Sequence, residues 1–119
     1  MSEKPHKKLK VWQESIVLAK MIYELTDKFP SSEKFGLISQ MRRAAISVAS
    51  NIAEGAARTG GQEKIQFFTI ARGSLSELDT QLEISKQLGL ISDNEKIYNK
   101  VEEVGLLLYG LIASRRRML

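Results

Sequence analysis

The chain has 119 residues, a length that suits one domain with a single hydrophobic core. It contains no cysteine, which excludes disulfides and thiolate metal sites, and its one histidine, His6, lies in a polar N-terminal segment. The longest nearly unbroken apolar run, residues 104–113, is too short to cross a bilayer, and no segment resembles a signal peptide. We therefore expect a cytoplasmic protein without a membrane span.

The formal net charge of +4 is unevenly distributed. The positive excess lies in two groups near the ends of the chain, one formed by Lys4, Lys7, Lys8 and Lys10 and the other by Arg115, Arg116 and Arg117. In one interpretation these groups are solvated ends of the chain, and the arginines complement the negative end of a helix. In the other they form a binding surface for polyanions. The second interpretation requires that the two groups meet in space.

Four segments show apolar or small residues at alternating steps of three and four, which predicts an all-α protein. The first predicted helix runs from about Leu9 to Phe29 and ends before Pro30. Its core stripe is Val11, Ser15, Leu18, Ile22, Leu25 and Phe29. The second spans about 33–58, with Ser31 or Ser32 able to cap it. Its inward residues are Ile38, Met41, Ala45, Val48 and Ile52.

The second predicted helix is unusual because small residues lie on several of its faces. Its further alanines, Ala44, Ala53, Ala56 and Ala57, let other helices approach closely, so the pattern favours packing on more than one side and hence oligomerisation. Its polar stripe is Gln40, Ser47, Asn51, Glu54 and Arg58, in which we expect Glu54 and Arg58 to form an ion pair. Arg42 flanks the core stripe and Arg43 points away from it, which suits surface or intersubunit ion pairs.

The third predicted helix spans about 62–88, between Gly60–Gly61 and Gly89. Its core side is formed by Phe68, Ala71, Leu75, Leu78, Leu82 and Ser85. Ser92 and Glu95 have the spacing of a capping box and open a fourth helix that ends near Arg117. Its inward residues are Ile97, Val101, Val104, Leu108 and Leu111.

The three short connections predict an antiparallel up-down-up-down four-helix bundle, a single domain over residues 1–119 with a flexible basic tail at 1–8. In this topology the starts of helices one and three share one end with the ends of helices two and four. The candidate nucleic-acid-binding residues converge at that end: Lys4, Lys7, Lys8, Lys10, Arg58, Lys64, Arg115, Arg116 and Arg117.

The residue inventory predicts no enzyme, no cofactor and no metal site. A di-iron bundle and a catalytic triad both need histidine, and no predicted helix contains one. Gly60–Gly61 lacks the Lys-Ser/Thr end of a phosphate-binding loop. A carboxylate-only magnesium site remains an alternative, but acidic residues on helices are usually solvated or paired. Its residues would be Glu77, Glu83, Glu102 and Glu103.

Four stretches, 39–45, 50–55, 71–78 and 80–83, occur in an order and spacing that resemble a known family. They read SQMRRAA, SNIAEG, ARGSLSEL and TQLE, and the KVWQ start at 10–13 and the Phe29–Pro30 stop agree as well. The chain resembles the four-helix-bundle proteins first noted as reading frames in intervening sequences of bacterial 23S rRNA genes. The matching signature residues, to which the resemblance attaches no catalytic role, are Arg42, Arg43, Asn51, Glu54, Arg72 and Glu77.

The resemblance implies an antiparallel bundle that assembles into a ring-like homopentamer. It also links the chain to the similar accessory proteins of diversity-generating retroelements, which work with a reverse transcriptase and RNA. Two functions remain open: a nucleic-acid-binding accessory protein that holds RNA or DNA through phosphates, and a protein–protein scaffold whose charged ends only confer solubility. Trp12, Phe67, Phe68 and Tyr109 fall on or beside core stripes, so no base-stacking platform is expected.

Overall fold

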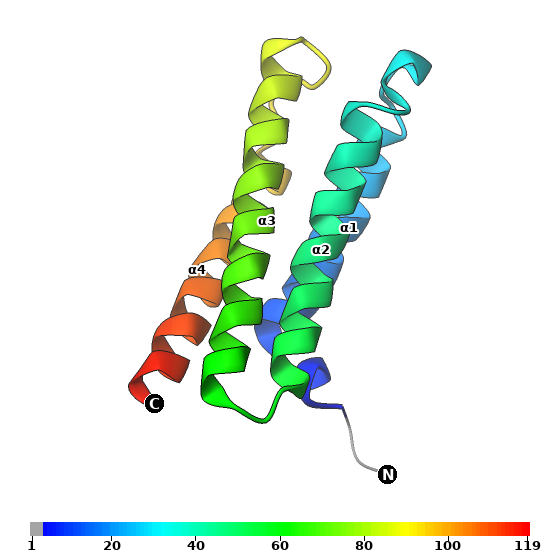
Figure 1. Ribbon diagram of the computed structural model, residues 1–119. Helices are drawn as coiled ribbons and strands as arrows, with labels where there is room; N and C mark the ends of the chain where they lie inside the picture. The colour runs from blue at the N-terminus through cyan, green and yellow to red at the C-terminus, as the bar shows by residue number, and fades with distance from the viewer. Residues whose placement is uncertain (1–3) are drawn as a thin grey trace.

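The computed structural model describes residues 4–119, which form helices and no strand. The four α-helices are α1 (Lys10–Thr26), α2 (Leu37–Ala57), α3 (Gly61–Gln87) and α4 (Glu95–Arg117). Two short 3-10 helices, η1 (Pro5–Lys8) and η2 (Ser31–Glu33), precede α1 and α2. The all-α class with four helices is confirmed (Figure 1). None of these helices has the length and hydropathy needed to cross a membrane.

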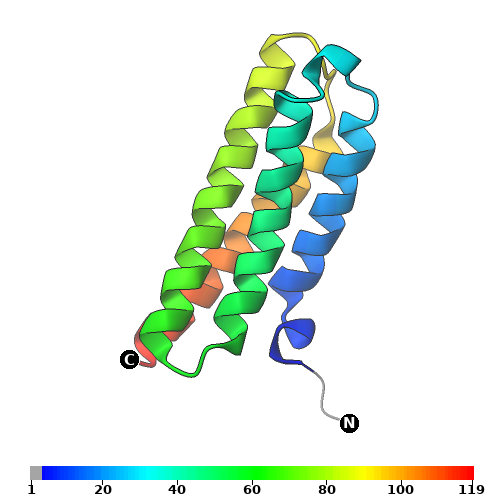
Figure 2. The same ribbon diagram turned by 45° about the vertical axis from the view of Figure 1, so that its right-hand side comes forward.

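The helices pack in the pairs α1–α2, α2–α3, α3–α4 and α1–α4, and the α2–α3 contact is the most extensive. Figures 1 and 2 show the described N-terminal segment, the α2–α3 connection and the C-terminus at one end of the elongated molecule, which measures 45 × 29 × 22 Å. The α1–α2 and α3–α4 connections lie at the opposite end. We call the first end, formed by η1, the α2–α3 connection and the last turns of α4, the basic end.

One hydrophobic core receives side chains from all four α-helices. The predicted core side of α3 is confirmed throughout, since all of its six residues are buried. Three residues that were predicted to face the core are only half-buried: Leu25, Ile38 and Leu111. In α1 and α4 the next residue along the chain is buried instead, Thr26 after Leu25 and Ile112 after Leu111. One step along a helix turns a side chain by about 100°, so this replacement means that the buried faces of α1 and α4 are slightly rotated from the predicted ones.

Two predicted helix starts are wrong. The chain at Ser31–Glu33 forms η2, so α2 begins only at Leu37, whose N–H lies 3.3 Å from the Glu33 Oε1 that accepts it. The N-cap of α4 is Asn94, because its Oδ1 accepts the Ile97 N–H at 3.3 Å, and Ser92 plays no capping part.

Residues 5–8, part of the predicted flexible tail, have a defined place against the bundle. They form η1, which contacts both α1 and α2. The side-chain amide of Gln13 donates to the Lys7 carbonyl at 2.8 Å, and the His6 ring lies edge-on to the Trp12 ring at 4.7 Å. Of the rest of that predicted tail, Lys4 directly precedes η1, and residues 1–3 lie outside the described residues.

The close α2–α3 contact depends on a glycine. A Cβ at Gly55 would lie 2.6 Å from Cε1 of Phe68, a side chain that is itself buried. Near the middle of the same interface the hydroxyls of Ser47 and Ser74 lie 2.8 Å apart. Small residues therefore let the two backbones approach within the chain, which is one of the packing roles that the sequence predicts for α2.

Replacing Gly55 with alanine should lower the free energy of unfolding by about 1–3 kcal/mol, because Phe68 must leave its place. The matched control is Gly73→Ala on α3, where the new methyl group meets nothing within 4 Å. Alanine should there stabilise the helix by about 0.5–1 kcal/mol. Urea unfolding of both variants measures the difference, and equal stabilities would refute the close contact.

Lys100 of α4 connects α4 with α1. Its Nζ lies 2.5 Å from Glu14 Oε1 and 2.8 Å from Glu103 Oε1. Hydrogen bonds to Glu103 and Glu14 raise the pKa of Lys100, and the bond from Lys100 lowers the pKa of Glu103. Lys10, the first residue of α1, contributes to this lowering.

This pair predicts a pH dependence of stability. The pKa of Glu103 is lower in the folded state than its unfolded value of 4.5. The contribution of Glu103 to the free energy of unfolding is therefore present above pH 4.5 and is lost as the pH falls below that value. The difference in unfolding free energy between the wild-type protein and Glu103→Gln should therefore shrink between about pH 6 and pH 3. Urea midpoints at several pH values measure it, and a constant difference would contradict the ion pair.

Candidate nucleic-acid interface

Arg58 follows the last residue of α2 and lies among compensating groups. Its Nη2 is 2.8 Å from Glu54 Oε2, which confirms the predicted ion pair, and its Nη1 is 4.0 Å from Glu63 Oε2. The guanidinium also lies 4.6 Å from the centre of the Phe67 ring. Of the predicted basic residues, Arg58 is thus the one whose charge is most fully offset by its neighbours.

Lys64 and Arg115 come together where α3 starts and α4 ends. The Lys64 ammonium donates to the Ala56 carbonyl at 3.0 Å, near the C-terminal end of α2, where carbonyls lack helical partners. Burial, and secondarily the positive charge of Arg115, lower the pKa of Lys64. Arg115 Nη1 lies 3.4 Å from Met118 Sδ. The fold thus places two like charges close together, a local field that favours an anion.

The remaining predicted basic residues are exposed, and no carboxylate among the described residues lies within 4.0 Å of their charged groups. They are Lys4, Lys7, Lys8, Lys10, Arg116 and Arg117. Exposed, uncompensated cations are the groups that contact phosphates and release counterions.

The predicted convergence at one end is only partly observed. Figure 2 shows the described N-terminal segment and the C-terminus on opposite sides of the basic end, with the end of α2 and the start of α3 between them. The cations therefore form two groups. The N-terminal group is Lys4, Lys7, Lys8 and Lys10, and the C-terminal group is Lys64, Arg115, Arg116 and Arg117.

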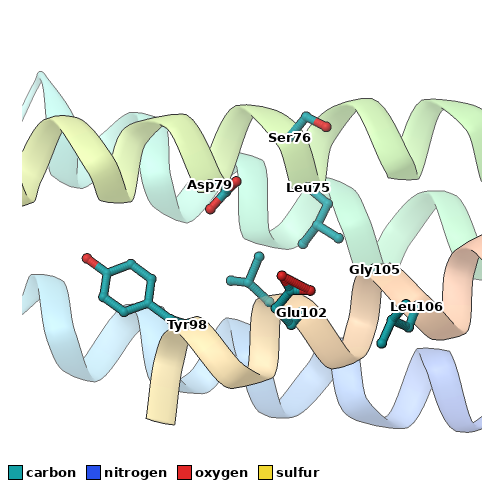
Figure 3. Close-up of a pocket in the computed structure, with 8 residues that line it drawn as sticks. Leu75, Ser76, Asp79, Tyr98, Glu102, Gly105 and Leu106 are labelled. Atoms are coloured by element: carbon teal, nitrogen blue, oxygen red, sulfur yellow. The ribbon is translucent and has the colours of Figure 1, made fainter. Parts of the chain in front are cut away.

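A groove of about 240 Å³ between α3 and α4 differs from the basic end, because its lining contains two carboxylates and no lysine or arginine. Figure 3 shows Asp79 and Leu75 of α3 on one side of it and Glu102 of α4 on the other, with Tyr98 toward one end. Burial raises the pKa of Tyr98. Two carboxylates disfavour phosphate, so this groove is no part of an RNA-binding surface. No group of three or more His, Cys, Asp or Glu suited to a metal ion occurs within residues 4–119.

Residues 7–110 match the family described as 23S rRNA-intervening sequence protein. The chain belongs to this family. A comparison with curated proteins found no match. The matched region contains α1, α2 and α3 and most of α4, whereas Lys4 and Arg115–Arg117 lie outside it. The match to the 23S rRNA-intervening sequence protein family therefore covers the bundle but not all of its basic end.

Arg42 and Asn51, two expected signature residues of the 23S rRNA-intervening sequence protein family, make contacts within the chain. Arg42 Nη2 lies 2.9 Å from Asp27 Oδ1, and its Nε donates to Thr26 Oγ1 at 2.9 Å. The same guanidinium is 4.3 Å from the centre of the Tyr23 ring, so Arg42 fastens α2 to the end of α1. The Asn51 amide donates to the Ser47 carbonyl at 2.9 Å.

Of the other signature residues, Glu54 forms the ion pair with Arg58 described above. Arg43 and Glu77 are exposed, and Arg72 is half-buried.

The prediction that Tyr109 lies on or beside a core stripe is wrong, because 65% of its surface is exposed on α4. Phe68 is buried as predicted, and Trp12 and Phe67 are half-buried. The pairing of His6 with Trp12 gave no signal in the sequence, because His6 stands alone in a polar segment.

Proposed function

We propose that this protein is a non-enzymatic RNA-binding accessory protein that holds structured RNA through its phosphates at the basic end. The observation that carries the proposal is the presence of exposed lysines and arginines with no carboxylate of the described residues within 4.0 Å, in two groups on either side of the α2–α3 connection. Neither group of cations has a base-reading element beside it comparable to a helix that enters a groove. Binding is therefore governed by charge and shape, with little dependence on duplex sequence.

The proposal includes an antiparallel up-down-up-down bundle that assembles into a ring-like homopentamer in the cytoplasm. The placement of the described N-terminal segment, the C-terminus and the α2–α3 connection at one end supports the topology (Figures 1 and 2). The resemblance to the bacterial intervening-sequence proteins implies the ring. Several copies on one RNA would multiply a modest affinity through effective concentration.

The direct experiment is fluorescence anisotropy of a labelled RNA hairpin titrated with the purified protein at low salt, with light scattering on the same sample. We expect a micromolar or tighter dissociation constant and a mass of five protomers. Absence of binding at low salt would refute the RNA-binding proposal, and a monomeric mass would refute the ring.

A protein–protein scaffold is the second candidate, and one observation favours it. Leu106 and Tyr109 of α4 are 69% and 65% exposed and, at a spacing of three residues, lie on one face of the helix, so they form an apolar patch of the kind that binds a partner protein. Under this alternative the protein has no salt-sensitive affinity for RNA. A defined partner should then be retained by the wild-type protein in a pull-down from the native host and lost by Tyr109→Ser. A pull-down that recovers the protein alone would count against it.

A further inference from the structure

A pocket between the N-terminal segment and α2 gives the N-terminal group of cations a shape as well as a charge. Its volume is about 450 Å³, and Lys4 and His6 line one side of it. Ser50, Ala53 and Ala57 of α2 line the other side. Small-molecule sites commonly have volumes of this order. The pocket lies where η1 packs beside α2, whose lining residues are small apart from Glu54.

The lining combines an apolar floor with a positive rim. The methyl groups of Ala53 and Ala57 offer a flat apolar surface, and the His6 imidazole forms an aromatic wall. Lys4 is exposed at the rim, and Lys7 and Lys8 follow directly in η1. A flat ring fits such a floor and wall, and a phosphate fits such a rim.

The one carboxylate in the lining does not oppose this reading. Glu54 Oε2 is 2.8 Å from Arg58 Nη2, so Glu54 forms an ion pair with Arg58, which is not one of the lining residues. The neighbouring charges of η1 are positive. The net field at the rim therefore attracts anions.

We infer that this pocket receives one unstacked nucleotide of RNA, with its base against Ala53, Ala57 and His6 and its phosphates beside the N-terminal lysines. The inference rests on the proposed function and deepens it, because it gives the protein a preference for single-stranded RNA. A base within a duplex is paired and stacked, so it does not enter a pocket of this size. Sequence preference stays weak, since any base has a flat face to stack.

Trp12 provides a built-in reporter for occupancy. It is the only tryptophan of the chain, and its ring centre lies 4.7 Å from that of His6 at an interplanar angle of 64°. A base that stacks on His6 changes the surroundings of the indole, whereas a phosphate bound at the C-terminal group of cations does not.

The test compares Ser50→Leu with the matched control Ser39→Leu, which adds the same side chain at another exposed serine of α2. Ser50 lines the pocket, whereas Ser39 is not among its lining residues. Two probes are used, a single-stranded oligoadenylate of about eight nucleotides and an RNA duplex of the same length. Anisotropy gives the affinities, and Trp12 emission gives the occupancy.

We expect the oligoadenylate to change Trp12 emission in the wild-type protein and in Ser39→Leu. Ser50→Leu should bind it about tenfold more weakly with no emission change, while all three proteins bind the duplex within about twofold of one another. Ala57→Leu, a second substitution at an exposed lining residue, should act like Ser50→Leu.

Equal binding of the oligoadenylate by Ser50→Leu, Ala57→Leu and Ser39→Leu would overturn the pocket inference and leave the proposed function standing. Absence of binding to either RNA by the wild-type protein would overturn both. The two failures are thus distinguished in one set of titrations.

Discussion

Replacing Arg115, Arg116 and Arg117 together with glutamate should weaken binding of structured RNA by at least about a hundredfold at low salt. The substitution removes three cations of the C-terminal group and places three anions at the end of α4, one of them at position 115 near Lys64. Arg116 and Arg117 are exposed and Arg115 is half-buried, so the bundle keeps its core. The cost to α4 is limited to unfavourable charges at its C-terminal end, about 1 kcal/mol or less for each residue.

The matched control reverses three exposed lysines at the opposite end of the molecule, Lys28, Lys34 and Lys96. It changes the net charge by the same amount but leaves the basic end intact. We expect it to lower affinity only severalfold, through the overall charge. Equal losses in the two triple variants would show that total charge, and not the basic end, determines binding.

Phe68→Ala should have the largest effect on stability, lowering the free energy of unfolding by about 3–5 kcal/mol. The Phe68 side chain is 1% exposed and packs where Gly55 lets α2 and α3 approach, so its removal leaves a cavity in the most extensive helix interface. A domain of this size has a total stability of about 5–15 kcal/mol, so the loss is a large share.

The control for this prediction is Phe35→Ala, because Phe35 is 88% exposed. Its urea midpoint should match that of the wild-type protein. A small loss for Phe68→Ala, comparable to that of Phe35→Ala, would contradict the packing of α2 on α3.

Hydropathy periodicity was enough to predict four helices and most of their buried faces. The six predicted core positions of α3 are all buried, because a long helix repeats its face many times and errors average out. The errors lie at helix ends. Ser92 and Asn94 are both good caps by residue type, and only the backbone geometry before Ile97 selects Asn94.

The arrangement of the candidate site was less predictable. The predicted topology puts both basic groups at one end, but it does not reveal that the end of α2 and the start of α3 separate them (Figure 2). The packing of η1 against α2 is a long-range contact of a few residues without periodicity. Such contacts depend on shape, so neither His6 as a pocket wall nor the pocket itself was foreseen from the sequence.

The most direct test of RNA binding through phosphates is the salt dependence of the affinity for a labelled RNA hairpin, measured by anisotropy with the wild-type protein. The predicted result is a straight line of log affinity against log salt concentration with a steep negative slope, which becomes shallower by about two to three units when Arg115, Arg116 and Arg117 are replaced by glutamate. An affinity that does not change with salt, or a slope that the substitution leaves unaltered, would contradict phosphate binding at the basic end.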